Sequence, residues 1–145
     1  MKRATIYERK GMFYIRASSL TTGDVWVEDG VCHAVAIDSD YEEIGKHLYI
    51  ALDYSCYNIP HPTDWKTVGI PLFEAAKVKS WSAFGKMAKC ISVNMDKQIQ
   101  LIPTANMSSR KQGFVHMNDN IITVPIPVDY TELGKKVKEA WLICE

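Results

Sequence analysis

A chain of 145 residues has the size of one domain, spanning 1–145, and is long enough to bury a hydrophobic core without disulfides or metals. It is 47% hydrophobic and 23% charged, as soluble globular proteins are, with no low-complexity tract or Pro/Ser/Gly-rich linker, which excludes an intrinsically disordered chain. The formal net charge of +0 gives no overall attraction to nucleic acids or membranes, so neither is expected as a partner.

The N-terminus and the cysteines indicate a compartment. The first ten residues are too charged for the apolar core of a signal peptide, and no apolar run approaches the length that spans a bilayer. The cysteines are widely spaced and form no CxxC pair: Cys32, Cys56, Cys90 and Cys144. We expect reduced, buried thiols, and since the histidines are equally scattered we expect no metal and no other cofactor. The expected location is the cytoplasm.

Strands come first in the chain. Residues 4–7 and 12–17 are rich in strand-forming side chains and are separated by Arg9-Lys10-Gly11, a turn signal, which predicts an opening hairpin. A polar loop, a short strand, a turn and another strand are expected next, over residues 18–23, 25–27, 28–30 and 31–37. The last of these strands leads into a helix.

One phrase occurs twice and marks the starts of two helices. Residues 40–48 and 129–137 share five of nine positions at a constant offset of 89. Asp40 and Asp129 are expected to be N-caps, each closing a capping box with the glutamate three residues later. The apolar residues that follow recur at helical spacing, so each helix should bury one stripe.

Both copies carry a glycine at the same place, Gly45 and Gly134. In an exposed helix interior glycine is less favourable than alanine by about 1 kcal/mol. Close backbone contact with another element is the structural explanation, and a ligand approaching the glycines is the alternative.

The middle of the chain differs from both ends. A proline-bounded loop at 58–62 precedes residues 63–88, whose apolar spacing predicts a helical connector with Ser80 as an N-cap. A second hairpin and two further strands are then expected at 91–93, 99–102, 114–117 and 121–124. Because proline cannot donate to a strand ladder, Pro125 and Pro127 should end the last strand or place it at an edge.

Other parts of the two ends also match, at offsets of 87 to 89. The fold class is therefore α+β: a single domain built from two pseudo-repeated strand-strand-strand-helix units, about 4–56 and 90–144, joined by the helical connector at about 63–88. Such halves could pack about a pseudo-two-fold axis. Whether the strands form one sheet or two is left open.

Charge is distributed unevenly. Residues 24–43 hold seven acidic side chains and no Lys or Arg, so that residues 1–62 carry a net −3 and residues 63–145 a net +3. Turns and helix N-termini attract acidic residues through capping and the helix dipole, which is one explanation. An acidic surface for a basic partner is the other.

The sequence offers no motif for catalysis. It contains no GxSxG, HExxH or GxxxxGK[ST] pattern and no glycine-rich turn after a strand. Lysines at 77–89 and 135–138 alternate with core positions along the expected helices and fit a solvated face better than a nucleic-acid site. We expect no catalytic residues and no enzyme.

Several segments together resemble a known family: Glu43-Ile-Gly-Lys, the run Val78-Lys-Ser-Trp-Ser-Ala-Phe-Gly-Lys-Met-Ala-Lys-Cys-Ile-Ser-Val, Ile102-Pro-Thr and Glu132-Leu-Gly-Lys. They resemble the CdiI-type immunity proteins of bacterial contact-dependent growth inhibition (CDI) systems, over most of the chain. The Val-Lys-Ser-Trp segment is the most specific element. Ile44 stands where the family pattern has leucine, which is a conservative difference.

The resemblance implies a non-enzymatic cytoplasmic protein that binds and neutralises the C-terminal toxin domain of its cognate CdiA. Such toxins are often nucleases, and a nuclease presents basic surface to its substrate, which an acidic surface would complement. The hypothesis for the toxin-binding surface comprises six residues: Glu28, Asp29, Asp38, Asp40, Glu42 and Glu43.

Two rival surfaces and one rival function stay open. The toxin could instead add to a sheet edge, or bind the basic half of the chain. The rival function is a small-molecule-binding or enzymatic α+β domain with its site between the two halves, near Gly45 and Gly134.

Overall fold

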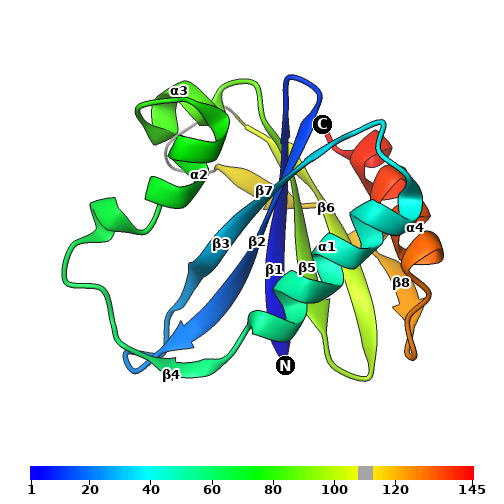
Figure 1. Ribbon diagram of the computed structural model, residues 1–145, viewed down its shortest axis with the longest axis horizontal. Helices are drawn as coiled ribbons and strands as arrows, with labels where there is room; N and C mark the ends of the chain where they lie inside the picture. The colour runs from blue at the N-terminus through cyan, green and yellow to red at the C-terminus, as the bar shows by residue number, and fades with distance from the viewer. Residues whose placement is uncertain (108–112) are drawn as a thin grey trace.

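The eight strands that the structure describes belong to a single sheet. The computed structural model describes residues 1–107 and 113–145. The strand order is β3-β2-β1-β5-β6-β7, with β4 paired to β2 and β8 paired to β6 (Figure 1). Four α-helices complete this part of the chain, so the predicted α+β class is confirmed. No helix within the described residues is long and apolar enough to cross a membrane.

The opening hairpin is present and is longer than expected. Strands β1 (Lys2–Arg9) and β2 (Met12–Thr21) pair antiparallel. The expectation of a polar loop over 18–23 was wrong for residues 18–21, which belong to β2, where Ser19 and Thr21 are buried. The Ser19 hydroxyl accepts a hydrogen bond from the Cys56 backbone N–H at 3.1 Å, so a distant segment makes this polar sequence a stable strand.

Strand β3 (Trp26–Ala36) replaces the two short strands and the turn expected over 25–37. The expected turn at 28–30 is a bulge within this strand: the pairing register with β2 shifts between Ile15 and Ala17. Gly30 has a φ of 79°, a conformation that glycine adopts without strain. The bulge keeps the strand paired on both sides of the turn-like sequence.

The centre of the sheet is the antiparallel pair of β1 with β5 (Lys89–Met95). Its register pairs Thr5 with Ser92, which lie 87 positions apart, as do the strand segments that matched in the sequence. Strand β6 (Gln98–Asn106) follows β5, and β7 (Phe114–His116) and β8 (Ile122–Pro125) both pair with β6. The last strand ends at Pro125 as predicted. The division into two repeated halves stays a prediction, which this register supports.

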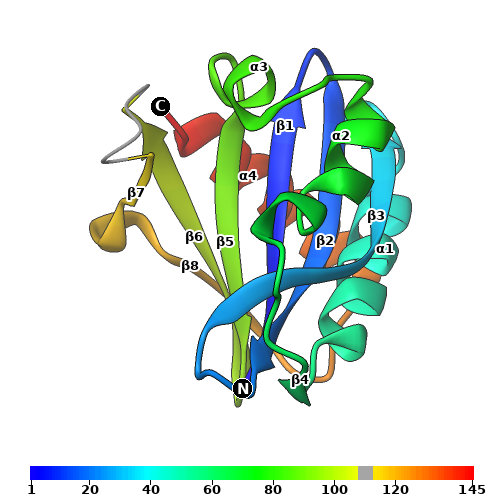
Figure 2. The same cartoon turned by 90° about the vertical axis from the view of Figure 1, so that its left-hand side faces the viewer.

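Helices α1 (Tyr41–Tyr54) and α4 (Tyr130–Ile143) lie side by side on one face of the sheet (Figures 1 and 2). They meet at the two glycines, where a Cβ on Gly45 would lie 1.9 Å from the Tyr130 carbonyl oxygen and a Cβ on Gly134 1.9 Å from that of Tyr41. The expected close backbone contact is confirmed. The larger hydrophobic core lies between these helices and the sheet.

The helix starts differ in their chemistry. Asp129 caps α4, since its Oδ1 accepts hydrogen bonds from the backbone N–H groups of Thr131 and Glu132. Asp40 precedes α1 but makes no capping hydrogen bond, so the capping box expected there was wrong. The Glu43 carboxylate instead binds His47, one turn along the helix.

The connector covers the opposite face of the sheet. It follows strand β4 (Tyr57–Ile59), which pairs with β2 in the sheet, and consists of a short 3-10 helix (Trp65–Thr67), α2 (Ile70–Ala76) and α3 (Trp81–Gly85) (Figure 2). Ser80 caps α3 as predicted, accepting a hydrogen bond from the Ala83 N–H at 3.2 Å. A second cluster, centred on Phe84 and Tyr7, lies beneath these helices. Strand β1 is thus buried on both faces.

Candidate functional site

Four of the six predicted toxin-binding residues lie close together on the surface. Asp38 and Asp40 lie in the turn between β3 and α1, and Glu42 and Glu43 lie in the first turn of α1. All four are exposed. We call this group the acidic turn: Asp38, Asp40, Glu42 and Glu43. Its carboxylates surround the N-terminus of a helix that is fixed in the core by Ile44 and Leu48.

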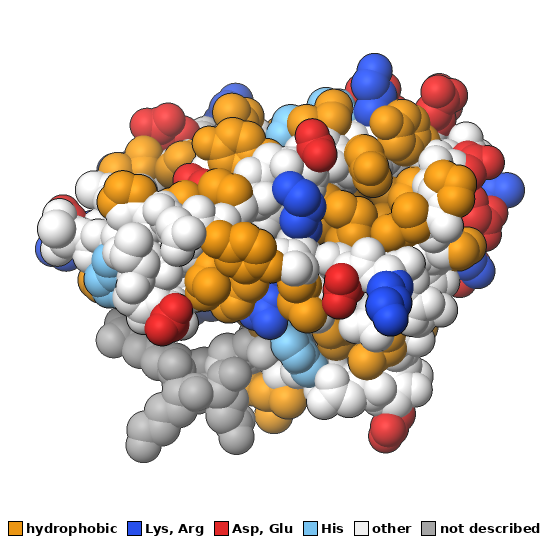
Figure 3. Space-filling model, turned by 90° about the horizontal axis from the view of Figure 1, so that it is seen from below, with side chains coloured by type: hydrophobic (Ala, Val, Ile, Leu, Met, Phe, Trp, Pro, Cys, Tyr) orange, Lys and Arg blue, Asp and Glu red, His pale blue; other side chains and the backbone are white. Residues whose placement is uncertain are grey.

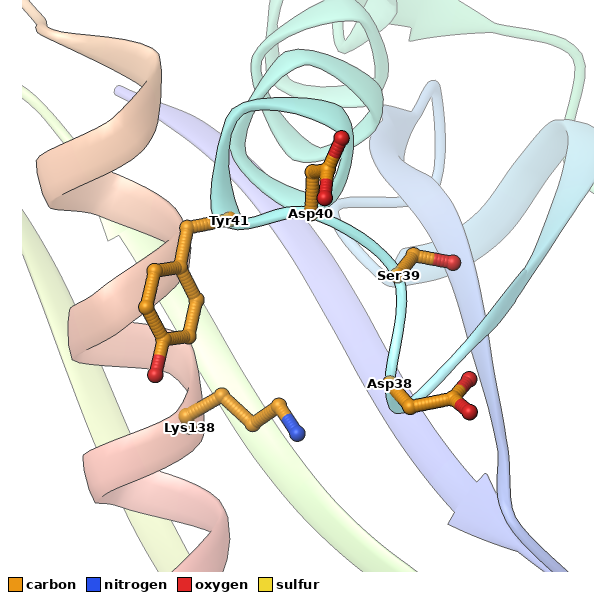
Figure 4. Close-up of a pocket in the computed structure, with 5 residues that line it drawn as sticks. All are labelled: Asp38, Ser39, Asp40, Tyr41 and Lys138. Atoms are coloured by element: carbon orange, nitrogen blue, oxygen red, sulfur yellow. The ribbon is translucent and has the colours of Figure 1, made fainter.

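A shallow pocket opens beside the acidic turn. It has a volume of about 230 Å³ and is lined by Asp38, Ser39, Asp40, Tyr41 and, from α4, Lys138. Figure 4 shows the Lys138 side chain reaching from α4 toward the β3–α1 turn, while the Asp38 carboxylate points away from Lys138 on the other side of the turn. Two acidic residues and one lysine therefore line the same pocket. The sequence did not reveal Lys138 as a neighbour of the acidic turn, because it lies 98 positions beyond Asp40 and reaches it only through the contact of the two helices.

Glu43 is connected to strand β3 through two histidine side chains. Its Oε1 lies 2.9 Å from His47 Nε2, and His47 Nδ1 lies 3.0 Å from His33 Nδ1 on β3. The Glu43 side chain is 54% exposed, so it stays accessible to solvent while it binds His47. Burial, and next the charge of His47, lower the pKa of His33. The first turn of α1 is thereby tied to the sheet.

The other two predicted residues lie apart from the acidic turn. Asp29 is half-buried at the bulge of β3. The Glu28 carboxylate points inward, where it accepts a hydrogen bond from the Tyr7 hydroxyl at 3.2 Å, and its Oε1 is buried without a hydrogen-bond partner among the described residues. Burial raises the pKa of Glu28, and the charge of Arg16 opposes that shift. The position of Glu28 gives it a role inside the sheet.

Arg16 is the buried cation of this region, at 5% exposure. Its Nε donates to the Gly30 carbonyl at 2.9 Å, and its Nη1 donates to the Val68 carbonyl. It therefore fastens the bulge of β3 and the start of the helical connector to the middle of β2. Burial raises the pKa of the neighbouring Cys32 thiol to about 11, so this thiol is protonated at neutral pH.

The groove expected between the halves is absent at the two glycines. Gly45 and Gly134 are buried, and each faces a backbone carbonyl of the other helix at a distance that leaves no space even for a methyl group. A ligand therefore cannot lie there. The structure thus leaves no room for a small-molecule or enzymatic site at these two glycines.

Apolar surface is a further feature of the molecule. Seen from below in Figure 3, hydrophobic side chains are spread over much of the face and single charged side chains interrupt them. Several large side chains are exposed on α1, β3 and β4: Val31, Ile50, Tyr54 and Tyr57. Strands β3 and β7 are the edge strands at the two ends of the strand order. The rival hypothesis, in which the toxin adds to a sheet edge, could therefore apply at either of them.

Comparison with solved structures places the fold. A protein of unknown function from Neisseria meningitidis superposes with a TM-score of 0.80 and 14% identity, covering 99% of this chain and 95% of its own. A chain from the CdiA-CT/CdiI toxin and immunity complex of Yersinia pseudotuberculosis superposes with a TM-score of 0.79 and 14% identity, covering 99% and 97%. At this identity the likeness establishes the fold alone. None of the curated protein sequences matches the chain.

The family follows from the sequence itself. Residues 2–144, nearly the whole chain, match the CdiI family, described as CDI immunity proteins. The match includes both glycine-containing helices and the Val-Lys-Ser-Trp segment, on which the resemblance in the sequence rested. The chain belongs to the CdiI family of CDI immunity proteins.

Proposed function

We propose that this immunity protein binds the C-terminal toxin domain of its cognate CdiA in the cytoplasm and blocks it sterically, without an enzymatic step. Membership of the CdiI family over residues 2–144 is the observation that carries the proposal. The solved toxin and immunity complex that shares the fold supports it. Because a blocking protein needs only a complementary surface, no catalytic group is required.

The proposed contact surface is the acidic turn together with Asp29. Its four exposed carboxylates lie within a few residues of one another, on a helix start that the core and the Glu43–His47–His33 chain hold in place. A rigid charged surface loses little conformational freedom on binding. Glu28 belongs to the proposed site only indirectly, because its buried carboxylate supports the strand that carries Asp29.

We further propose that the toxin is a nuclease. A nuclease binds phosphates through Lys and Arg, and the acidic turn would cover such a surface and accelerate its capture. The pocket beside the acidic turn, which Asp38 and Asp40 help to line, adds a concave site next to these carboxylates. Purified toxin domain should therefore cleave DNA or RNA, and a toxin with no such activity would contradict this assignment.

The binding surface is tested by charge reversal. The variant Asp38→Lys/Asp40→Lys/Glu42→Lys should weaken toxin binding by at least about 100-fold, since each close interfacial charge pair contributes about 1.5 kcal/mol or more. The matched control is Glu74→Lys/Asp96→Lys/Asp119→Lys, which changes net charge equally at exposed positions elsewhere. Calorimetric titration at two salt concentrations measures both variants. Equal losses in the two would place the contact elsewhere and favour a sheet edge.

The non-enzymatic mechanism has its own test. Stoichiometric blocking predicts that toxin activity falls linearly with added immunity protein and reaches zero near equimolar amounts. Dissociation of the complex should return fully active toxin of unchanged mass. Inhibition by substoichiometric amounts, or a toxin of altered mass, would instead indicate an enzymatic step.

A further inference from the structure

Two histidines from different elements direct the same ring nitrogen at one another. His33 lies on β3 and His47 on α1, and their Nδ1 atoms are 3.0 Å apart with the ring centroids at 5.1 Å. Both side chains are partly exposed. Paired imidazole nitrogens with access to water are the commonest protein ligands of transition metals.

The contact with Glu43 determines which nitrogen of His47 carries the proton. An ionised carboxylate only accepts hydrogen bonds, so the contact of 2.9 Å between Glu43 Oε1 and His47 Nε2 requires the proton to be on Nε2. The neutral His47 ring then carries its lone pair on Nδ1, facing His33. A carboxylate that binds the far nitrogen of a metal-ligating histidine fixes the ring and raises its basicity. Glu43 and His47 are one helical turn apart, which holds this pair in register.

The spacing of the two nitrogens suits a shared ion. With metal–nitrogen distances of about 2.0–2.1 Å, two ligands at a right angle lie about 2.9 Å apart and two tetrahedral ligands about 3.4 Å apart. The observed 3.0 Å lies within this range, and each ring must turn by about 35–45° so that its lone pair points at an ion beside the line between the two nitrogens. His33, whose side chain is partly exposed, must then carry its proton on Nε2.

We propose that His33 and His47 bind one divalent transition metal ion of the Ni²⁺, Cu²⁺ and Zn²⁺ group through their Nδ1 atoms, joining α1 to β3. Within residues 1–107 and 113–145 no group of three or more His, Cys, Asp or Glu side chains is placed to hold a metal ion. Water therefore completes the coordination, and the affinity is that of a two-histidine site. Glu43 belongs to both the acidic turn and this site, but the test of metal binding needs no toxin, so failure of one proposal can be told from failure of the other.

The test uses the full chain without a histidine tag and Ni²⁺ alone as the probe. Calorimetric titration should give one saturable site. His33→Gln and His47→Gln should each weaken binding at least about 10-fold, because a single histidine remains. The matched controls are His61→Gln and His116→Gln, which remove the other two histidines and should leave binding unchanged. Circular dichroism checks that every variant is folded.

Two further measurements separate this site from unspecific binding. Glu43→Gln should weaken Ni²⁺ binding about 10- to 100-fold through loss of the supporting carboxylate. In proton NMR spectra, substoichiometric paramagnetic Ni²⁺ should broaden the ring signals of His33 and His47 before those of His61 and His116. Absence of binding at millimolar Ni²⁺, equal broadening of all four rings, or unchanged affinity in the His33 and His47 variants would each overturn the proposal.

Discussion

Gly45 and Gly134 place the two long helices in reciprocal contact: each glycine lies against the carbonyl group of the tyrosine that begins the other helix. A Cβ added to either glycine would lie 1.9 Å from the carbonyl oxygen it faces, that of Tyr130 or that of Tyr41. The two glycines lie 89 positions apart in the sequence, and so do the two tyrosines, so the same contact is made twice. Glycine is required here by the approach of a backbone rather than by an unusual φ.

Replacing either glycine by alanine should therefore destabilise the protein, although alanine is the better helix former. Gly45→Ala and Gly134→Ala should each lower the free energy of unfolding by about 2 kcal/mol or more, because the added methyl group forces the helices apart. Urea denaturation measures the change.

Gly85→Ala is the matched control for this prediction. Gly85 also lies in a helix, but its added Cβ would meet only Trp81 Nε1, at 3.8 Å. There alanine should be neutral or stabilising by up to about 1 kcal/mol. Equal effects at Gly45 and Gly85 would show that the helix contact is looser than the structure describes.

The two helix starts offer a second comparison. Asp129 Oδ1 accepts hydrogen bonds from Thr131 N at 2.9 Å and Glu132 N at 3.4 Å, whereas Asp40 caps nothing. Asp129→Ala should thus lower the free energy of unfolding by about 1 kcal/mol. Asp40→Ala should have a clearly smaller effect. Thermal denaturation of both variants checks the difference, and a larger loss at Asp40 would mean that it caps α1 in solution.

Local sequence signals predicted much of this fold. The hairpins, the helices after Asp40 and Asp129 and the cap at Ser80 all follow from patterns within about ten residues. The close approach of the helices also followed, since a glycine repeated at one helical position needs a packing reason. The family resemblance then led to the function, which composition could not have indicated.

The features that the sequence did not predict depend on contacts between distant segments. The sequence around Ser19 is typical of a loop, but in the structure the Cys56 backbone N–H donates a hydrogen bond to its hydroxyl. The sequence around Glu28 is typical of a surface turn, but in the structure its carboxylate accepts a hydrogen bond from Tyr7. The sequence gives no sign that His33 and His47 meet, because they lie on different elements. Spacing along one element cannot reveal such partners, since the turn between the elements sets their register.

Glu28 should make stability depend on pH. Burial raises its pKa above the ordinary value of 4.5, so the folded state favours the protonated carboxyl. Stability that Glu28 contributes is fully present below 4.5 and is lost as the pH rises through the raised folded pKa. Glu28→Gln removes this loss. Relative to the wild type, the variant should therefore gain stability between mildly acidic and neutral pH, as measured by urea denaturation across that range.

Glu42→Gln is the control for the pH experiment, because it neutralises an exposed carboxylate on α1 and leaves Glu28 and its neighbours unchanged. Its stability difference from the wild type should stay small over the same range. A Glu28→Gln difference that is flat with pH, or that favours the wild type more as the pH rises, would contradict the buried position of this carboxylate.

Arg16 and Glu28 should be coupled in stability. Arg16→Met leaves the Gly30 and Val68 carbonyls without their donor. It also removes the positive charge that favours the ionised form of the Glu28 carboxylate, so it should destabilise the protein by about 3 kcal/mol. Adding Glu28→Gln to Arg16→Met should recover part of this loss, because no buried charge then remains uncompensated. A double-mutant cycle at neutral pH should give a coupling of about 1 kcal/mol. Strict additivity would mean that Arg16 acts only through its two backbone hydrogen bonds, and that the carboxylate of Glu28 is stabilised by Tyr7 alone.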